Sequence, residues 1–101
     1  MLLAIADGNM VGMIGVRDCS YIALLFVERA FQRRGIGRAL MGQALDRCRS
    51  KGRELREINV RAAPNATKAY ESMGFRLTDA EQEVNGVRFV PMVLVLSNAT
   101  P

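Results

Sequence analysis

The chain has 101 residues, of which 50% are hydrophobic and 24% are charged, a balance typical of one small globular domain. Because it has two cysteines and no histidine, we expect no disulfide framework, and a Cys/His zinc site and a histidine-dependent nucleophile are excluded. The net charge is +4, and the longest apolar run is far too short to span a bilayer. These features predict a single domain over residues 1–101 in a reducing cytoplasm, with residues 97–101 as a frayed tail.

Three strands are predicted at the start of the chain. Strands over residues 1–6 and 11–17 flank the sequence Asp-Gly-Asn at positions 7–9, which is typical of a hairpin turn. Residues 21–27 are continuously apolar, as in a strand that is buried on both faces.

Apolar residues then recur at helical spacing, which predicts a helix over residues 38–51. The apolar face of this helix is expected to comprise Ala39, Leu40, Ala44, Leu45 and Cys48. Alternation over residues 58–62 predicts a short strand. Asn65 is a candidate N-cap for a second, short helix that includes Tyr70 and closes at Gly74.

The last part of the chain is again typical of strands. Strands over residues 75–84 and 87–96 flank Asn85-Gly86, a strong hairpin signal. The order of the elements predicts an α/β (α+β) fold. In this fold a mixed, mostly antiparallel twisted sheet contains a central strand–helix–strand unit.

The turn over residues 32–37 reads Gln-Arg-Arg-Gly-Ile-Gly and joins an apolar strand to an amphipathic helix. The first backbone N–H groups of such a helix have no intrahelical partner, and the helix dipole favours an anion beside them. Glycine lets the backbone approach that anion, and Arg33, Arg34 and Arg38 add positive charge. The turn therefore predicts a phosphate or pyrophosphate site. Two alternatives are glycines that only form a turn and arginines that only form a solvated basic face.

Two other phosphate-binding patterns do not fit this sequence. The chain has no Gly-x-x-x-x-Gly-Lys-Ser/Thr run. The pair Gly35 and Gly37 is next followed by Gly42, so the pattern Gly-x-Gly-x-x-Gly is not completed.

The turn resembles the Gln/Arg-x-x-Gly-x-Gly/Ala loop of the GNAT acetyltransferase superfamily. Residues 25–27 are similar to the strand end before that loop, and Phe31 stands at its usual aromatic position, although Arg29 replaces a common proline. Residues 65–75 resemble the family's Asn-x-x-Ala-x-x-x-Tyr-like helix, which ends in Gly-Phe. The resemblance covers roughly residues 11–96 and implies a GNAT-like acyl-CoA N-acyltransferase fold.

The resemblance implies that acetyl-CoA is the cosubstrate and that no metal takes part. The residues that it places at the pyrophosphate are Gln32, Arg33, Arg34, Gly35, Ile36, Gly37 and Arg38. The strand end of Leu25, Phe26 and Val27 would bind the pantetheine arm through its backbone. Asn65 would cap the second helix, alone or while also contacting the same arm. Tyr70 is the implied general acid that protonates the departing CoA thiolate; the alternative is a core tyrosine.

Members of this family usually have a strand and two helices before the hairpin with which this chain opens, so the chain resembles a short form. Without them, apolar side chains of the first strands should be exposed. The residues concerned are Leu2, Leu3, Ile5, Met10 and Met13. We expect a homodimer to cover this face; the alternative is a truncated fragment of a longer gene product.

The function that we expect is N-acetyl transfer from acetyl-CoA to an amine of a small molecule or protein. The alternative is a CoA-binding protein without turnover. A nucleic-acid-binding module is disfavoured, because the basic residues surround a Gly-x-Gly turn without exposed aromatic residues between them. No membrane association is expected.

Overall fold

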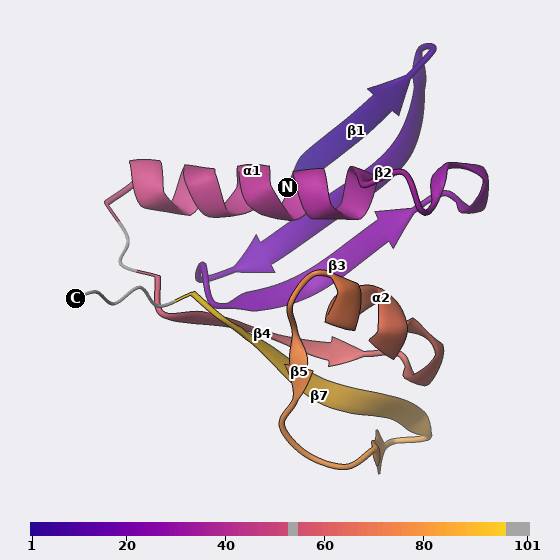
Figure 1. The fold of residues 1–101 in the computed structure, drawn as a ribbon, viewed down its shortest axis with the longest axis vertical. Helices are drawn as coiled ribbons and strands as arrows, with labels where there is room; N and C mark the ends of the chain where they lie inside the picture. The colour runs from indigo at the N-terminus through magenta and orange to yellow at the C-terminus, as the bar shows by residue number, and fades with distance from the viewer. Residues whose placement is uncertain (53–54, 97–101) are drawn as a thin grey trace. The chain divides into compact units, whose positions relative to one another are not determined.

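The first three strands form an antiparallel meander in the computed structural model, which describes residues 1–52 and 55–96 (Figure 1). They are β1 (Leu2–Ala6), β2 (Asn9–Arg17) and β3 (Tyr21–Val27). The chain divides into two units, Met1–Leu55 and Arg56–Pro101, and these strands belong to the first. The tail predicted over residues 97–101 lies outside the described residues.

Tight turns join these strands: two residues separate β1 from β2, and three residues separate β2 from β3. Asp7 and Gly8 have φ angles of 52° and 80°, so both lie in the left-handed region that a type I′ hairpin turn requires, and the predicted hairpin is confirmed. Asp18 and Cys19 repeat this geometry between β2 and β3, with φ angles of 54° and 52°.

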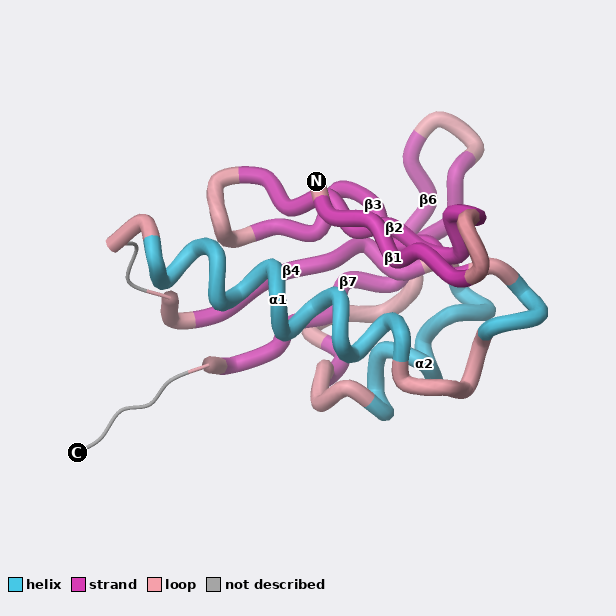
Figure 2. The backbone as a smooth tube through the Cα atoms, turned by 90° about the horizontal axis from the view of Figure 1, so that it is seen from above, coloured by secondary structure: helices cyan, strands magenta, loops and turns pink. Residues whose placement is uncertain are grey.

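The helix α1 (Ile36–Ser50) covers one face of the meander (Figures 1 and 2). Its buried residues are Leu40, Met41, Ala44, Leu45 and Cys48. The helix begins two residues before the predicted start, because Gly35 at the N-cap adopts a left-handed conformation with φ of 80°. The predicted apolar face was wrong at one residue: Ala39 is exposed, and Met41 lies in the buried stripe instead.

The prediction that β3 is buried on both faces was wrong. Leu24 and Phe26 are 41% and 45% exposed, whereas the alternate residues Leu25 and Val27 are half-buried. The continuous apolar run therefore gives this strand one half-buried face and one exposed apolar face.

The second unit is built around β7 (Val87–Val95), which pairs antiparallel with β4 (Glu57–Ala62). The short strands β5 (Arg76–Leu77) and β6 (Gln82–Val84) pair antiparallel with different parts of β7. The buried core of this unit comprises Ile58, Val60, Ala62, Tyr70, Phe75, Phe89, Val90, Met92 and Val93. A 3₁₀ helix, η2 (Pro64–Ala66), leads into the short helix α2 (Thr67–Ser72).

The strand predicted over residues 75–84 is interrupted. The side chain of Asp79 accepts hydrogen bonds from the backbone N–H of Ala80, at 2.7 Å, and from Nε2 of Gln82, at 3.1 Å. Such local side-chain bonds compete with the strand ladder and produce a bend between β5 and β6. The hairpin predicted at Asn85-Gly86 is confirmed, with φ angles of 53° and 81°.

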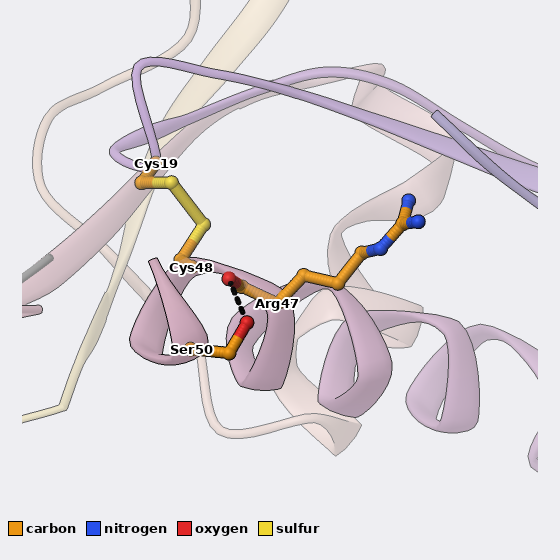
Figure 3. The surroundings of a disulfide bond; sticks show 4 residues. All are labelled: Cys19, Arg47, Cys48 and Ser50. Atoms are coloured by element: carbon orange, nitrogen blue, oxygen red, sulfur yellow. Dashed lines mark hydrogen bonds between the residues drawn. A yellow bond between two sulfur atoms is a disulfide. The ribbon is translucent and has the colours of Figure 1, made fainter. Parts of the chain in front are cut away.

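A disulfide joins Cys19 to Cys48, with their Cα atoms 5.9 Å apart, so the expectation of no disulfide was wrong (Figure 3). Cys48 is a buried residue of α1, as predicted, and Cys19 lies in the turn after β2. The two residues are 29 positions apart, and their spacing resembles no recognisable motif. Only the packing of α1 on the meander brings them together.

All the strand pairings within the two units are antiparallel, and the predicted mixed α+β fold is confirmed. In the described part of the chain, no helix is both long and apolar enough to cross a lipid bilayer.

Candidate anion-binding turn and acyl-transfer site

The turn between β3 and α1 folds back on the strand ends. The backbone N–H of Glu28 donates to the carbonyl oxygen of Val11 at 2.7 Å, which extends the pairing of β3 with β2. A 3₁₀ helix, η1 (Arg29–Phe31), follows. The side-chain amide of Gln32 then donates to the carbonyl oxygen of Val27 at 3.0 Å. These bonds hold the beginning of the turn against the end of β3.

Two residues with a left-handed backbone conformation direct the chain from the turn into the helix. Arg33 has a φ of 67° and Gly35 a φ of 80°. The first intrahelical bond runs from the N–H of Ala39 to the carbonyl oxygen of Gly35 at 2.9 Å. The N–H groups of Ile36 and Gly37 therefore precede the first i→i−4 bond and stand at the positive end of the helix dipole. The first turn of α1 contains no acidic residue, so the charge at this helix end is positive.

Three arginines flank these amides in the sequence. Arg33, Arg34 and Arg38 are all exposed. The guanidinium of Arg34 lies over the ring of Phe31, with its Cζ atom 5.1 Å from the ring centroid, which restrains a side chain that would otherwise be mobile. Backbone amides and guanidinium groups together can bind a phosphate or pyrophosphate.

The end of β3 lies beside the first turn of α1. A Cβ atom at Gly37 would lie 3.8 Å from Cγ2 of Val27, so the helix begins close to the last residue of the strand. The predicted pyrophosphate and pantetheine segments thus meet within the first unit. Of the pantetheine segment, Leu25 and Val27 are half-buried and Phe26 is exposed.

Gly12 is a residue of this arrangement that sequence reasoning missed. A Cβ atom at this position would lie 3.0 Å from the carbonyl oxygen of Phe26 and 3.3 Å from Cδ1 of Leu40. The glycine thus permits the close approach of α1 to the meander. A glycine inside a strand was the available signal, because such residues often mark a close backbone or helix approach.

Tyr70 belongs to the second unit and lies on α2. Its side chain is 8% exposed and packs edge-to-face on Phe75, with ring centroids 5.2 Å apart. The backbone N–H of Phe75 also donates to the carbonyl oxygen of Tyr70 at 3.0 Å. Most of the Tyr70 ring therefore forms part of the core of this unit.

The prediction that Asn65 caps the second helix was wrong. Asn65 is an exposed residue inside η2, and the N-cap of α2 is Ala66, which makes no side-chain capping bond. Pro64 favours the start of the 3₁₀ turn, and this turn moves the beginning of α2 past Asn65.

The chain matches the model of the acetyltransferase (GNAT) domain family over residues 1–96. A comparison with curated protein sequences finds no match. The fold is similar to that of a GCN5-related N-acetyltransferase (aminotransferase, class II) from Rhodopseudomonas palustris, with a TM-score of 0.77 and 21% identity. The similarity covers 93% of this chain but only 59% of that chain.

Two further similar structures contain a CoA species. One is an aminoglycoside 6'-N-acetyltransferase complexed with coenzyme A, with a TM-score of 0.76, 13% identity, and coverage of 98% of this chain and 73% of that chain. The other is a Bacillus anthracis protein, described as a streptothricin acetyltransferase, in complex with acetyl coenzyme A. Its TM-score is 0.75 and its identity 18%, with coverage of 94% of this chain and 61% of that chain. At these identities the structures establish the fold, and the family match over residues 1–96 establishes that the chain belongs to the GNAT acetyltransferase family.

Proposed function

We propose that this protein is an N-acetyltransferase that transfers the acetyl group of acetyl-CoA to an amine of a small molecule or protein. The observation that carries the proposal is the turn before α1, where the amides of Ile36 and Gly37 and the side chains of Arg33 and Arg34 lie at one helix end. The CoA and acetyl-CoA complexes of two similar structures support the same ligand class.

The cofactor contacts follow from the order of the segments. The turn over residues 32–38 would bind the pyrophosphate through backbone amides and arginine side chains. The end of β3, residues 25–27, would pair with the amides of the pantetheine arm as an added strand does. Asn65 is exposed and would reach the same arm with its side-chain amide.

The proposed chemistry is direct attack of the acceptor amine on the thioester carbonyl. The carbon–sulfur bond breaks, and the CoA thiolate takes a proton from the hydroxyl of Tyr70. The amine loses its own proton to a carboxylate or to water, because the chain has no histidine. No metal is required for these steps.

The alternative is a protein that binds CoA or acetyl-CoA without turnover. Its support is the burial of the Tyr70 ring against Phe75, which is also what a purely structural tyrosine would do. The chain also spans only 59% of the length of the Rhodopseudomonas protein. Turnover decides between the two functions.

The proposed partner in solution is a second copy of the chain. The face of the meander opposite α1 carries the cross-strand row Leu3, Met13 and Phe26. Leu3 is 54% exposed and Phe26 45% exposed. β1 and β3 contain no charged residue, and the one charged residue of β2 is Arg17 at its end, so the face fits another apolar face rather than a charged partner. A two-fold axis would pair this face with itself, and such an interface buries about 800 Å² on each partner.

A cytoplasmic location remains a prediction, and cell fractionation tests it. The Cys19–Cys48 disulfide bears on it, because disulfides in cytosolic proteins are usually transient or redox-sensing.

The experiment that tests the function is isothermal titration calorimetry of the full chain with acetyl-CoA, with adenosine as the control without a pyrophosphate. We expect saturable binding of acetyl-CoA that adenosine does not reproduce, followed by release of CoA thiol when an amine acceptor is added. A folded chain that does not bind acetyl-CoA contradicts both the enzyme and the silent binding protein. Binding without thiol release across a panel of amines favours the silent protein.

A further inference from the structure

The helix α1 is held against β2 at both of its ends. At its beginning, a Cβ atom at Gly12 would lie 3.3 Å from Cδ1 of Leu40 and 3.4 Å from Cγ2 of Ile36, so the helix rests directly on the strand backbone. At its end, Cys48 is bonded to Cys19, two residues after β2 (Figure 3). About 18 Å of helix separates the two attachments. The disulfide therefore fixes where the helix lies along the strand.

Cys19 occupies an unusual backbone position. It follows Asp18 in the turn between β2 and β3, and its φ of 52° lies in the left-handed region that glycine prefers. The turn is closed by a hydrogen bond from the N–H of Ser20 to the carbonyl oxygen of Arg17, at 3.1 Å. Glycine would adopt this conformation more easily than cysteine, but only the cysteine can form a disulfide bond to the helix.

The two cysteines differ in burial. Cys19 is half-buried in the turn after β2, whereas Cys48 lies on the buried face of α1 and is 5% exposed. Of the two cysteines, Cys19 is therefore the one that we expect a small thiol to attack. This asymmetry is what a reversible exchange reaction needs, because one sulfur is attacked and the other leaves.

We propose that Cys19 and Cys48 form a reversible thiol–disulfide pair that controls how firmly α1 is seated on β2. The turn before α1 is continuous with the helix, so its amides move with it. The oxidised chain holds these amides in place, and the reduced chain lets the helix shift along β2. The effect of the disulfide on the position of α1 follows from the geometry alone. The effect of the disulfide on acetyl-CoA binding rests on the proposed function.

Two successive thiol–disulfide exchanges reduce the Cys19–Cys48 bond. The thiolate of a small-molecule thiol of the glutathione or dithiothreitol class attacks Sγ of Cys19. The Cys19–Cys48 bond breaks, and Cys48 leaves as a thiolate that takes up a proton. A second thiol then releases Cys19 and forms a small-molecule disulfide. Two electrons and two protons pass to the protein, and a small-molecule disulfide reverses the reaction.

The test compares the full chain after oxidation with glutathione disulfide and after reduction with dithiothreitol, without ligand. Alkylation followed by mass spectrometry should find no modified cysteine in the oxidised chain and two in the reduced chain. Reduction should lower the melting temperature by more than about 5 °C. Hydrogen exchange of the amides in the first turn of α1, residues 36–39, should become faster on reduction.

Cys19→Ser is the matched control, because it removes the bond at its surface end and leaves the buried Cys48 in place. This variant should melt like the reduced wild-type chain and should not respond to dithiothreitol. If the variant is too unstable to purify, the reduced wild-type chain carries the same comparison. Cysteines that stay free under oxidising conditions overturn the proposal, as does equal exchange at residues 36–39 in both redox states.

The link to the cofactor has its own readout. Affinity for acetyl-CoA should fall about fivefold on reduction of the wild-type chain and should not change with dithiothreitol in Cys19→Ser. Equal affinity in both states overturns the link. If neither state binds acetyl-CoA, the proposed function fails, and hydrogen exchange and melting temperature still decide whether the pair controls the helix.

Discussion

The side-chain amide of Gln32 donates a hydrogen bond to the backbone carbonyl oxygen of Val27, with 3.0 Å between Nε2 and the oxygen. Val27 is the last residue of β3, and Gln32 precedes the two left-handed residues that lead into α1. One exposed side chain thus closes the turn that presents the helix amides. Much of the candidate site is held in place by hydrogen bonds of this kind, between residues that are close in the sequence.

Gln32→Ala should weaken the binding of acetyl-CoA about fivefold, because a hydrogen bond worth about 1 kcal/mol no longer restrains the turn. The free energy of unfolding should fall by at most about 1 kcal/mol, the worth of the same exposed bond. Titration calorimetry and chemical denaturation measure the two quantities. Gln43→Ala, an exposed glutamine on α1, is the control and should leave the affinity unchanged.

Gly35→Ala should weaken acetyl-CoA binding about fivefold and lower the free energy of unfolding by about 1 kcal/mol. An alanine at φ of 80° is strained, although no atom lies within 4 Å of the new Cβ. Gly42→Ala is the matched control, because its Cβ also meets no atom within 4 Å but its backbone is helical. That variant should gain about 0.5–1 kcal/mol and bind normally. Equal affinities in the two variants would show that the conformation at Gly35 does not matter.

Arg34→Ala should weaken acetyl-CoA binding about fivefold, because an exposed guanidinium beside the turn contributes only modestly to anion binding in water. The loss should shrink as the salt concentration rises. Arg49→Ala serves for comparison: Arg49 is an exposed arginine of α1 that pairs with Asp46 at the far end of the helix. A similar loss in both variants would point to net charge rather than to a local site.

Tyr70→Phe should lower kcat by about 100-fold while the Kd for acetyl-CoA stays within a factor of two, because only the proton donor is removed. The rate of CoA thiol release, measured with the best acceptor from a panel of amines, gives kcat. Tyr21→Phe alters the other tyrosine of the chain, on β3, and should retain full activity. A fully active Tyr70→Phe would leave Tyr70 with a structural role against Phe75.

Leu3→Lys should convert a dimer into a monomer, because it places a charge on the apolar outer face of the meander. Light scattering at micromolar concentration measures the molar mass. Leu77→Lys introduces the same charge at a leucine of nearly equal exposure, 53% against 54%, in the second unit. It should not change the molar mass. A wild-type chain that is monomeric at this concentration contradicts the proposed dimer.

Local patterns were sufficient for most of the elements. The alternation of Ile58, Val60 and Ala62 predicts β4, and all three side chains are buried. The Asn85-Gly86 turn predicts its hairpin because few other residue pairs adopt two positive φ angles. The bend at Asp79 was not predicted, since it depends on the hydrogen bonds that the Asp79 carboxylate accepts from Ala80 and Gln82.

In the candidate site, too, some residues could be assigned from the local sequence and others could not. The turn at residues 32–37 could be predicted because its residues are consecutive, and their spacing alone brings glycines and arginines to a helix end. The resemblance that identified the family depends on the same consecutive residues. Asn65 was misassigned because Pro64 starts a 3₁₀ turn before α2.

The sequence by itself determined most of the strands and helices, the candidate anion-binding turn and the family, since each depends on residues near one another in the chain. Only the tertiary structure decided that Cys19 meets Cys48, that Gly12 seats α1, and that Phe26 stays exposed. Each of these depends on which distant segments pack together. The contacts of a helix that covers one face of a meander depend on the fit between the two surfaces, and the other face stays open. Residues that are neighbours in the sequence do not show which contacts will form.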